Sequence, residues 1–370
     1  MMCAAPKDVA VIIPARNEAE RIGACLAAFA GQRSRATVIL VVNNTTDATA
    51  EIARAAAERD NVDLKVLICV LGPTDGVGAA RRIGCDYALR HMLQLRYLMT
   101  TDADCIVAPD WIARNVQHLE TADVVCGRVE LIESEKGILS GMNHALATNE
   151  GRYRTLVQRL YARYAAGSAQ LGGTHGEAAG ASIVFNKAAY LAVGGFEPAG
   201  CGEDRQFVRA LRSSGYQVLH ADDVIVHASC RLAGRAVGGM SDALKARIEG
   251  TDYLVDDCLP AADWLVRSAV AGTLGVWPPL VPAERRVHVQ DLPANISALE
   301  TFFRSRRVAK ARSTLIARTQ RTAWSHPAGR WPGDGLAASA AAPATWDPPG
   351  CQQPDLSRTS GRIYIERKLK

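Results

Sequence analysis

Residues 97–105 read YLMTTDADC, a short apolar run, long enough for one buried strand, that stops at two carboxylates. Asp102 and Asp104 stand two residues apart, and a helix start follows at Pro109 and Asp110. In an open α/β sheet, ligands gather outside the carboxyl ends of the strands, so acidic residues there face a crevice. Two hard oxygen ligands suit Mg²⁺ or Mn²⁺, although the tripeptide by itself also fits an ordinary solvated turn.

Three similar units precede this stretch. Apolar runs lie at residues 9–14, 37–42 and 64–71, and each leads through a polar or glycine-containing turn into a helical pattern. The first two helical patterns cover residues 19–29 and 47–58, and the third ends at about residue 93. Strands that alternate with helices predict β-α-β units, an α/β fold class and a mainly parallel sheet flanked by helices. The turn after the first strand, PARNE at residues 14–18, has no glycine, which argues against the dinucleotide-binding fingerprint.

A second acidic cluster follows about a hundred residues later. After expected strands at residues 124–129 and 181–185, with expected helices at residues 153–166 and 187–193, the chain reaches Glu203 and Asp204 at the start of another helix. Carboxylates in a first turn are favoured by the helix dipole, so the pair fits either a plain N-terminal charge pair or a general base. A strand at residues 222–227 then ends at His227, which becomes a metal ligand only if Asp102 and Asp104 are near.

The C-terminal part divides by composition. Residues 231–239 combine arginines with glycines, a mixture able to wrap a diphosphate or to form a flexible surface loop. A helical pattern runs over residues 242–318, and residues 325–360 are rich in Pro, Gly, Ala and Ser without periodicity. We therefore expect a catalytic domain over 1–240, a helical extension over 241–322 and a disordered basic tail over 323–370.

Composition indicates a soluble globular protein, with 370 residues, 48% of them hydrophobic and 22% charged. The net charge of +5 comes from residues 304–370, which hold 13 Lys and Arg against 4 Asp and Glu. Such a tail can meet anionic lipid or simply remain solvated, and we expect no nucleic-acid partner. The ten cysteines form no C-x-x-C pair and no signal peptide or membrane span is recognised, so we expect reduced thiols and a cytoplasmic location, with peripheral contact to the inner membrane through the tail.

Four ordered pieces together resemble the family 2 glycosyltransferases of the GT-A fold. They are IIPARNE at residues 12–18, TDAD at residues 101–104, GGF at residues 194–196 and GED at residues 202–204, and the resemblance covers roughly residues 9–239. It implies an inverting transfer of a sugar from a nucleotide-diphosphate donor, expected to be a UDP-sugar, to an acceptor hydroxyl. The reaction would be assisted by Mg²⁺ or Mn²⁺.

The resemblance also implies roles for particular residues. Asp204 would be the catalytic base, Asp104 would hold the metal, and His227 would complete its shell. Donor binding is expected from a larger set, comprising Pro14, Arg16, Glu18, Asn43, Arg81, Asp102 and Arg235. The family often carries an acidic residue where Asn43 stands and an asparagine where Arg82 stands, so recognition of the base is expected to differ here.

The chemistry fits these residue types directly. A nucleotide diphosphate leaves poorly unless its developing charge is neutralised, and an inverting displacement needs its base on the opposite face, away from the cation. Two other functions stay open: a nucleotidyltransferase, which normally has a glycine- and arginine-rich loop after the first strand, and a non-catalytic module that binds nucleotide sugars. The donor sugar, the acceptor and the oligomeric state are not fixed by the sequence.

Overall fold

The computed structural model describes residues 8–306, except residues 33, 35, 200, 235–237 and 251, and the backbone of residues 362–364. The chain divides into two units, residues 1–299 with 359–370, and residues 300–358. Of the second unit only residues 300–306 are described, as the end of a helix over 292–306. Everything below concerns the first unit.

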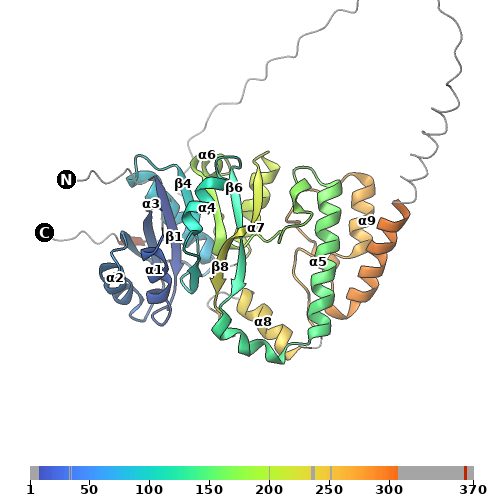
Figure 1. The fold of residues 1–370 in the computed structure, drawn as a ribbon, viewed down its shortest axis with the longest axis horizontal. Coiled ribbons are helices and arrows are strands. Elements are labelled where there is room, and N and C mark those ends of the chain that lie inside the picture. Colours follow the sequence, from blue (N-terminus) through green and yellow to red (C-terminus); the bar gives the residue numbers. More distant parts are fainter. Residues whose placement is uncertain are drawn as a thin grey trace, which may run out of the picture. The chain divides into compact units, whose positions relative to one another are not determined.

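A mixed sheet of nine strands forms the centre of this unit, in the order β5-β8-β6-β7-β4-β1-β2-β3-β9 (Figure 1). The strands are β1 (Val9–Ala15), β2 (Thr37–Asn43), β3 (Leu64–Val70), β4 (Tyr97–Thr100), β5 (Cys105–Val107), β6 (Val124–Leu131), β7 (Ile183–Asn186), β8 (Val218–Ala228) and β9 (Arg362–Tyr364). The four strands β3, β2, β1 and β4 are mutually parallel. Antiparallel β7 joins them to the parallel pair β6 and β8, and antiparallel β5 and β9 form the edges.

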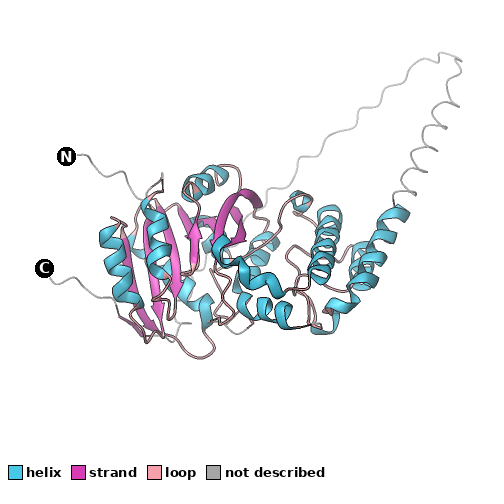
Figure 2. Cartoon of the chain, turned by 60° about the horizontal axis from the view of Figure 1, so that its bottom comes forward, coloured by secondary structure: helices cyan, strands magenta, loops and turns pink. Residues whose placement is uncertain are grey.

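Helices cover both faces of the sheet (Figure 2). They are α1 (Ile22–Ala30), α2 (Thr49–Arg59), α3 (Gly76–His91), α4 (Trp111–His118), α5 (His144–Tyr164), α6 (Lys187–Ala192), α7 (Glu203–Ser213), α8 (Met240–Glu249) and α9 (Ala262–Ala271). One apolar core packs α1, α2 and α4 against the sheet, and the other packs α3, α6 and α7 against the opposite face. The predicted α/β fold class, a sheet flanked by helices, is confirmed.

β1 extends further than its neighbour β4 at the carboxyl end of the sheet. β4 stops at Thr100, which pairs with Ile12 of β1, so Pro14 lies beyond the paired length of β4. A proline inside a sheet normally costs a ladder hydrogen bond because it lacks an N–H. Here β1 has only β2 beside it at that level, through the pair of Pro14 with Val41. The polar residues that follow β1 and β4 therefore emerge at the same open edge.

A bulge bends the second half of the sheet. β6 pairs with β8 in register up to Gly127 opposite Ala221, and the register then jumps so that Arg128 faces Ile225. A Cβ on Gly127 would lie 2.3 Å from the Ser182 hydroxyl, so only glycine allows this close approach. Because a bulge re-aims the residues beyond it, the end of β6 turns away from the line of its first half.

Several predicted boundaries shift for local reasons. The first helix begins at Ile22 rather than residue 19, because the Glu18 carbonyl accepts the N–H groups of Arg21 and Ile22 in a preceding turn. The helix predicted over 153–166 begins at His144, where Asn143 caps it by accepting from the N–H groups of the second and third following residues. β8 starts at Val218, four residues before the predicted strand.

The helical pattern over residues 242–318 is interrupted in the described part, as α8, α9 and the helix over 292–306. Glycine and proline punctuate the gaps, at Gly250, Pro260 and Pro278. This segment braces α5, since the Tyr153 hydroxyl donates to the Pro260 carbonyl at 2.5 Å. Apart from the three residues of β9, the tail predicted as disordered over 323–370 lies outside the described residues.

Two further observations concern the chain as a whole. Eight cysteines lie in the described part, and all of them are free thiols. Among the described residues, no helix combines the length and the apolar character needed to cross a bilayer. The domain boundaries at residues 240 and 322 stay predictions.

Candidate active site

A first carboxylate set forms at the carboxyl ends of β1 and β4. The Arg231 guanidinium donates to both oxygens of Glu18, at 2.7 and 2.6 Å, and lies 3.0 Å from the Asp104 carboxylate. The pKa of Asp104 is raised to about 6, chiefly by burial and further by the carboxylates of Asp102 and Glu18, while Arg231 lowers it. Arg231 therefore faces the two carboxylates of Glu18 and Asp104, which leaves net negative charge at this edge.

A buried arginine joins this set to the second acidic cluster. Arg81 on α3 is only 3% exposed, and its guanidinium donates to Asp102 at 2.5 Å and to Glu203 of α7. It also fills the space above Gly180, where a Cβ would lie 2.3 Å from the guanidinium nitrogen. Through these two ion pairs Arg81 holds Asp102 in place, and its predicted contact with the donor stays a prediction.

The two acidic residues of the second cluster have different surroundings. Glu203 is buried against Arg81, and burial raises its pKa to about 7 despite that arginine, with Asp204 adding repulsion. Asp204 is half-buried, and its oxygens accept from the Gly180 N–H at 2.9 Å and from the Arg205 N–H at 2.7 Å. Among the described residues no side-chain cation pairs directly with Asp204. Of the two carboxylates, Asp204 is thus the one that is not engaged by an arginine side chain and can accept a proton.

The turns after β1 and β2 are fixed by asparagines. Asn17 adopts a left-handed conformation at φ 54°, and its side-chain oxygen accepts from the Thr46 N–H at 2.8 Å. Asn44, also left-handed at φ 46°, exchanges two hydrogen bonds with the backbone of Leu71 at 2.8 and 3.0 Å. These bonds tie the ends of three neighbouring strands into one rigid edge.

The predicted donor residues of β1 and β2 lie at this edge in different settings. Pro14 is buried within the strand, Arg16 is exposed just after it, and Asn43 is half-buried at the last position of β2. Arg16 and Asn43 therefore offer polar atoms at this edge of the sheet, whereas Pro14 is enclosed within it. Arg235, which was also predicted to bind the donor, lies outside the described residues.

His227 is not brought into the carboxylate set. It lies within β8, paired with Ile106 of β5 and Glu130 of β6. Its ring nitrogens, with Asp102 and Asp104, do not form a trio of ligand atoms within 4.8 Å, and over the described residues only Asp256, Asp257 and Cys258 do. That trio is a salt-bridge centre, since Asp256 pairs with Arg154 and Arg205, each at 3.1 Å.

Sequence reasoning missed two features of this site. Arg231 was included only in a glycine-rich segment, yet it is the cation that meets Glu18 and Asp104. Its position three residues after the end of β8 and its charge were the only signals, and neither predicts a contact with a residue more than two hundred positions away. The ion pair of Glu203 with Arg81 was not predicted either, because Arg81 was assigned to the donor and Glu203 was considered only together with Asp204.

The carboxylates of Asp102 and Asp104 fit a divalent cation. Asp104 and Asp102 supply hard oxygen ligands, and the carboxylates of Asp102 and Glu18 add repulsion to the burial that raises the pKa of Asp104. An added cation would relieve that repulsion, as Arg231 now does in part. Asp104 and Asp102 are accordingly the residues that would hold Mg²⁺ or Mn²⁺.

Comparison with known proteins finds a family model that matches part of the chain. Residues 10–190 match the model of glycosyl transferase family 2. A stretch of 128 residues is 34% identical to glycosyltransferase AglE of Haloferax volcanii, covering 33% of this chain and 39% of that protein. The chain thus matches about two fifths of the length of its curated relative. Residues 10–190 are thus a glycosyl transferase family 2 domain.

Several solved structures are also similar. A mannosyltransferase from Pyrobaculum calidifontis, in complex with GDP-Man and Mn²⁺, aligns with a TM-score of 0.44 and 20% identity over 88% of this chain and 89% of that chain. The S. aureus TarS fragment 1–349 with UDP aligns with a TM-score of 0.42 and 13% identity over 70% and 71% of the two chains. Identities this low speak to the fold and not to substrates.

Proposed function

We propose that this protein transfers a sugar from a nucleotide-diphosphate donor to an acceptor hydroxyl, with inversion at the anomeric carbon. The observation that carries the proposal is the separation of two carboxylate sets by one buried arginine, Arg81, which pairs with Asp102 on one side and Glu203 on the other. A donor half and a proton-accepting half are what an inverting displacement requires. UDP-sugars are the first donors to test.

The donor half would lie at the carboxyl ends of the parallel strands. Arg16 and Asn43 would contact the nucleoside, and Asp102 and Asp104 would hold Mg²⁺ or Mn²⁺. A bound divalent cation would neutralise the charge that develops on the departing diphosphate. Arg231, now paired with Glu18 and Asp104, is a further cation at this edge that can reach phosphate oxygens once the carboxylates are neutralised.

The other half would activate the acceptor. Asp204 accepts hydrogen bonds from two backbone N–H groups, which fix its orientation while leaving further lone pairs for a hydroxyl proton. Glu203, one residue earlier, is committed to Arg81 and would serve to position α7. A nucleotidyltransferase would use the metal carboxylates but would have no need of this second carboxylate. The cytoplasmic location and the membrane contact through the tail stay predictions from composition.

The first test measures nucleotide binding, with and without Mn²⁺, by the melting temperature of the protein. Ligands that bind the folded state raise the melting temperature, and a concentration of 100 times Kd adds about 2.7 kcal/mol. We expect UDP or a related nucleotide diphosphate to stabilise the protein much more with Mn²⁺ than without it. Asp104→Asn should abolish the Mn²⁺-dependent part.

The matched control is Asp263→Asn, an exposed aspartate in the first turn of α9, paired only with surface arginines in the described structure. This variant should respond to nucleotide and Mn²⁺ as the wild type does. If no nucleotide diphosphate shifts the melting temperature, or if Asp104→Asn keeps the full Mn²⁺ effect, the proposed donor site is wrong.

A further inference from the structure

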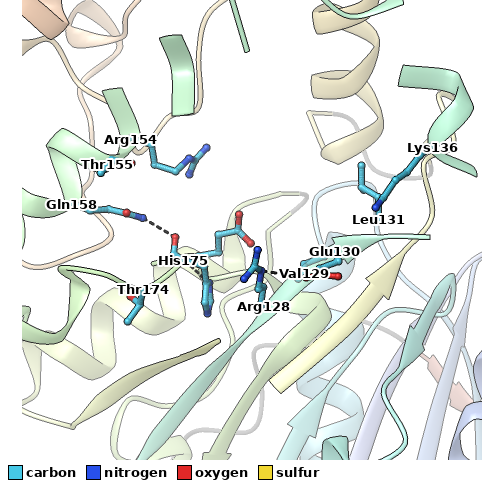
Figure 3. A pocket seen from close by; sticks show the side chains of 11 residues that line it. Arg128, Val129, Glu130, Leu131, Lys136, Arg154, Thr155, Gln158, Thr174 and His175 are labelled. Carbon is cyan, nitrogen blue, oxygen red and sulfur yellow. Dashed lines mark hydrogen bonds and ion pairs between the residues drawn. The ribbon is translucent and has the colours of Figure 1, made fainter. Parts of the chain in front are cut away.

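A cavity whose lining includes neither Asp102 nor Asp104 lies between the end of β6, helix α5 and the loop over residues 174–177 (Figure 3). Its volume is about 570 Å³, which is in the range of small-molecule sites. Of the eleven residues that line it, only Val129 and Leu131 are aliphatic. A cavity with so few apolar walls suits a polar ligand better than a lipid chain.

This cavity is linked to the proposed base through a loop and a pair of ion pairs. The loop that carries His175 and Glu177 into the cavity continues to Gly180, whose N–H donates to Asp204. From the other side, Arg154 of the cavity pairs with Asp256, which also holds Arg205, the residue next to the base. Asp204, like Asp102 and Asp104, is not among the lining residues, so an acceptor anchored in the cavity would extend along this loop to reach it.

Three cations from three different elements converge on the cavity: Arg128 from β6 beyond its bulge, Lys136 from the 3₁₀ helix η1 (Glu133–Gly141), and Arg154 from α5 (Figure 3). Arg128 is the least committed, because its side chain is 49% exposed and its nearest carboxylate oxygen, from Glu130, is 3.4 Å away. That distance is longer than a normal N–H···O hydrogen bond.

Each of the three cations has a carboxylate partner, but not an equally close one. Lys136 pairs with Glu133, and Arg154 shares Asp256 with Arg205. Among the described residues, Arg128 has Glu130 as its ion-pair partner, at 3.4 Å. Arg128 is therefore the cation of the lining that is most available to an incoming anion.

Resting on the glycosyl transfer proposed above, we propose that this cavity is the acceptor subsite and that the acceptor carries an anionic group, a phosphate or a carboxylate, bound by Arg128 with Lys136 and Arg154. Guanidinium groups bind either anion through paired, charge-assisted hydrogen bonds. Glu177 and Gln158 would accept or donate hydrogen bonds to hydroxyl groups on the rest of the acceptor. The acceptor class is therefore a polar, hydroxylated acid rather than a neutral sugar.

Three probes that share one ring test this inference by calorimetry on the full chain: glucose 6-phosphate, glucuronate and glucose. We expect at least one of the two acids to bind about tenfold tighter than glucose, a difference of about 1.4 kcal/mol. The preferred acid tells whether phosphate or carboxylate is the recognised group. Arg128→Gln should remove most of that preference while leaving UDP binding unchanged.

The control is Arg163→Gln, which removes an exposed cation from the last turn of α5, away from the cavity lining. It should bind all probes as the wild type does. Equal binding of the three probes, no binding of any of them, or an unchanged acid preference in Arg128→Gln would overturn the inference. UDP with Mn²⁺ is titrated in parallel, so a protein that binds UDP but no acid keeps the proposed function and loses only the acceptor assignment.

Discussion

At the scale of single residues, Gly180 is the point where the two halves of the site touch. Its carbonyl accepts from the Thr100 hydroxyl at 2.8 Å, its N–H donates to Asp204, and its Cα faces the guanidinium of Arg81. A side chain here has no free space, because the guanidinium is itself held by two carboxylates. The glycine is therefore required by packing and not by backbone conformation.

We predict that Gly180→Ala displaces Arg81, lowers the free energy of unfolding by about 1–3 kcal/mol and reduces the transfer rate. Denaturant unfolding and a donor-turnover assay measure the two effects. Gly151→Ala is the control, since nothing lies within 4 Å of a Cβ at this position within α5. Alanine there should stabilise the helix by about 0.5–1 kcal/mol. A Gly180→Ala protein as stable and active as the wild type would contradict this packing.

At the scale of elements, β8 is tied to the loop over residues 172–180 by a buried histidine. His220 accepts a hydrogen bond from Arg212 of α7 at 2.9 Å through Nε2, and its Nδ1 donates to the Glu177 carbonyl at 3.0 Å. This arrangement needs the neutral ring. Burial lowers the pKa of His220 well below its usual value, and Arg212 and His175 lower it further.

This depressed pKa predicts a pH-dependent stability. Below about pH 6.5 the unfolded chain binds a proton at this histidine that the folded chain refuses, so the free energy of unfolding falls as the pH drops. Relative to His220→Gln, which cannot titrate, the wild type should lose up to about 1.4 kcal/mol per pH unit between pH 6.5 and pH 5. Urea unfolding of both proteins at several pH values measures the difference, and a difference independent of pH would contradict the neutral, buried ring.

The elements also show what the sequence could predict. Buried parallel strands read as continuous apolar runs, so β1, β2 and β4 were placed within a residue or two, with the acidic strand end at Asp102. The bulge after Gly127 was not predicted, because it depends on contact with Ser182 across the sheet. The cavity at the end of β6 was not predicted either, because its cations come from separate segments that share no sequence motif.

At the scale of the whole molecule, the account rests on a division of labour between two parts of the chain. The donor carboxylates follow strands of the parallel half, and Asp204 enters with α7 about a hundred residues later. Arg81 spans the two by pairing with Asp102 and Glu203. If the division is right, removing the base must separate binding from turnover.

The most direct measurement is made on Asp204→Asn, an isosteric change that replaces one carboxylate oxygen by an amide nitrogen. It removes the basic group and keeps one acceptor oxygen for the two backbone N–H groups of Gly180 and Arg205. UDP release from the best-binding UDP-sugar is followed in the presence of acceptor, beside calorimetric titration of the donor with Mn²⁺. We predict that turnover falls by about 10²–10⁴-fold while the donor Kd changes less than about threefold. Turnover at the wild-type rate, or equal losses of donor binding and turnover, would contradict the assignment of Asp204 as the base.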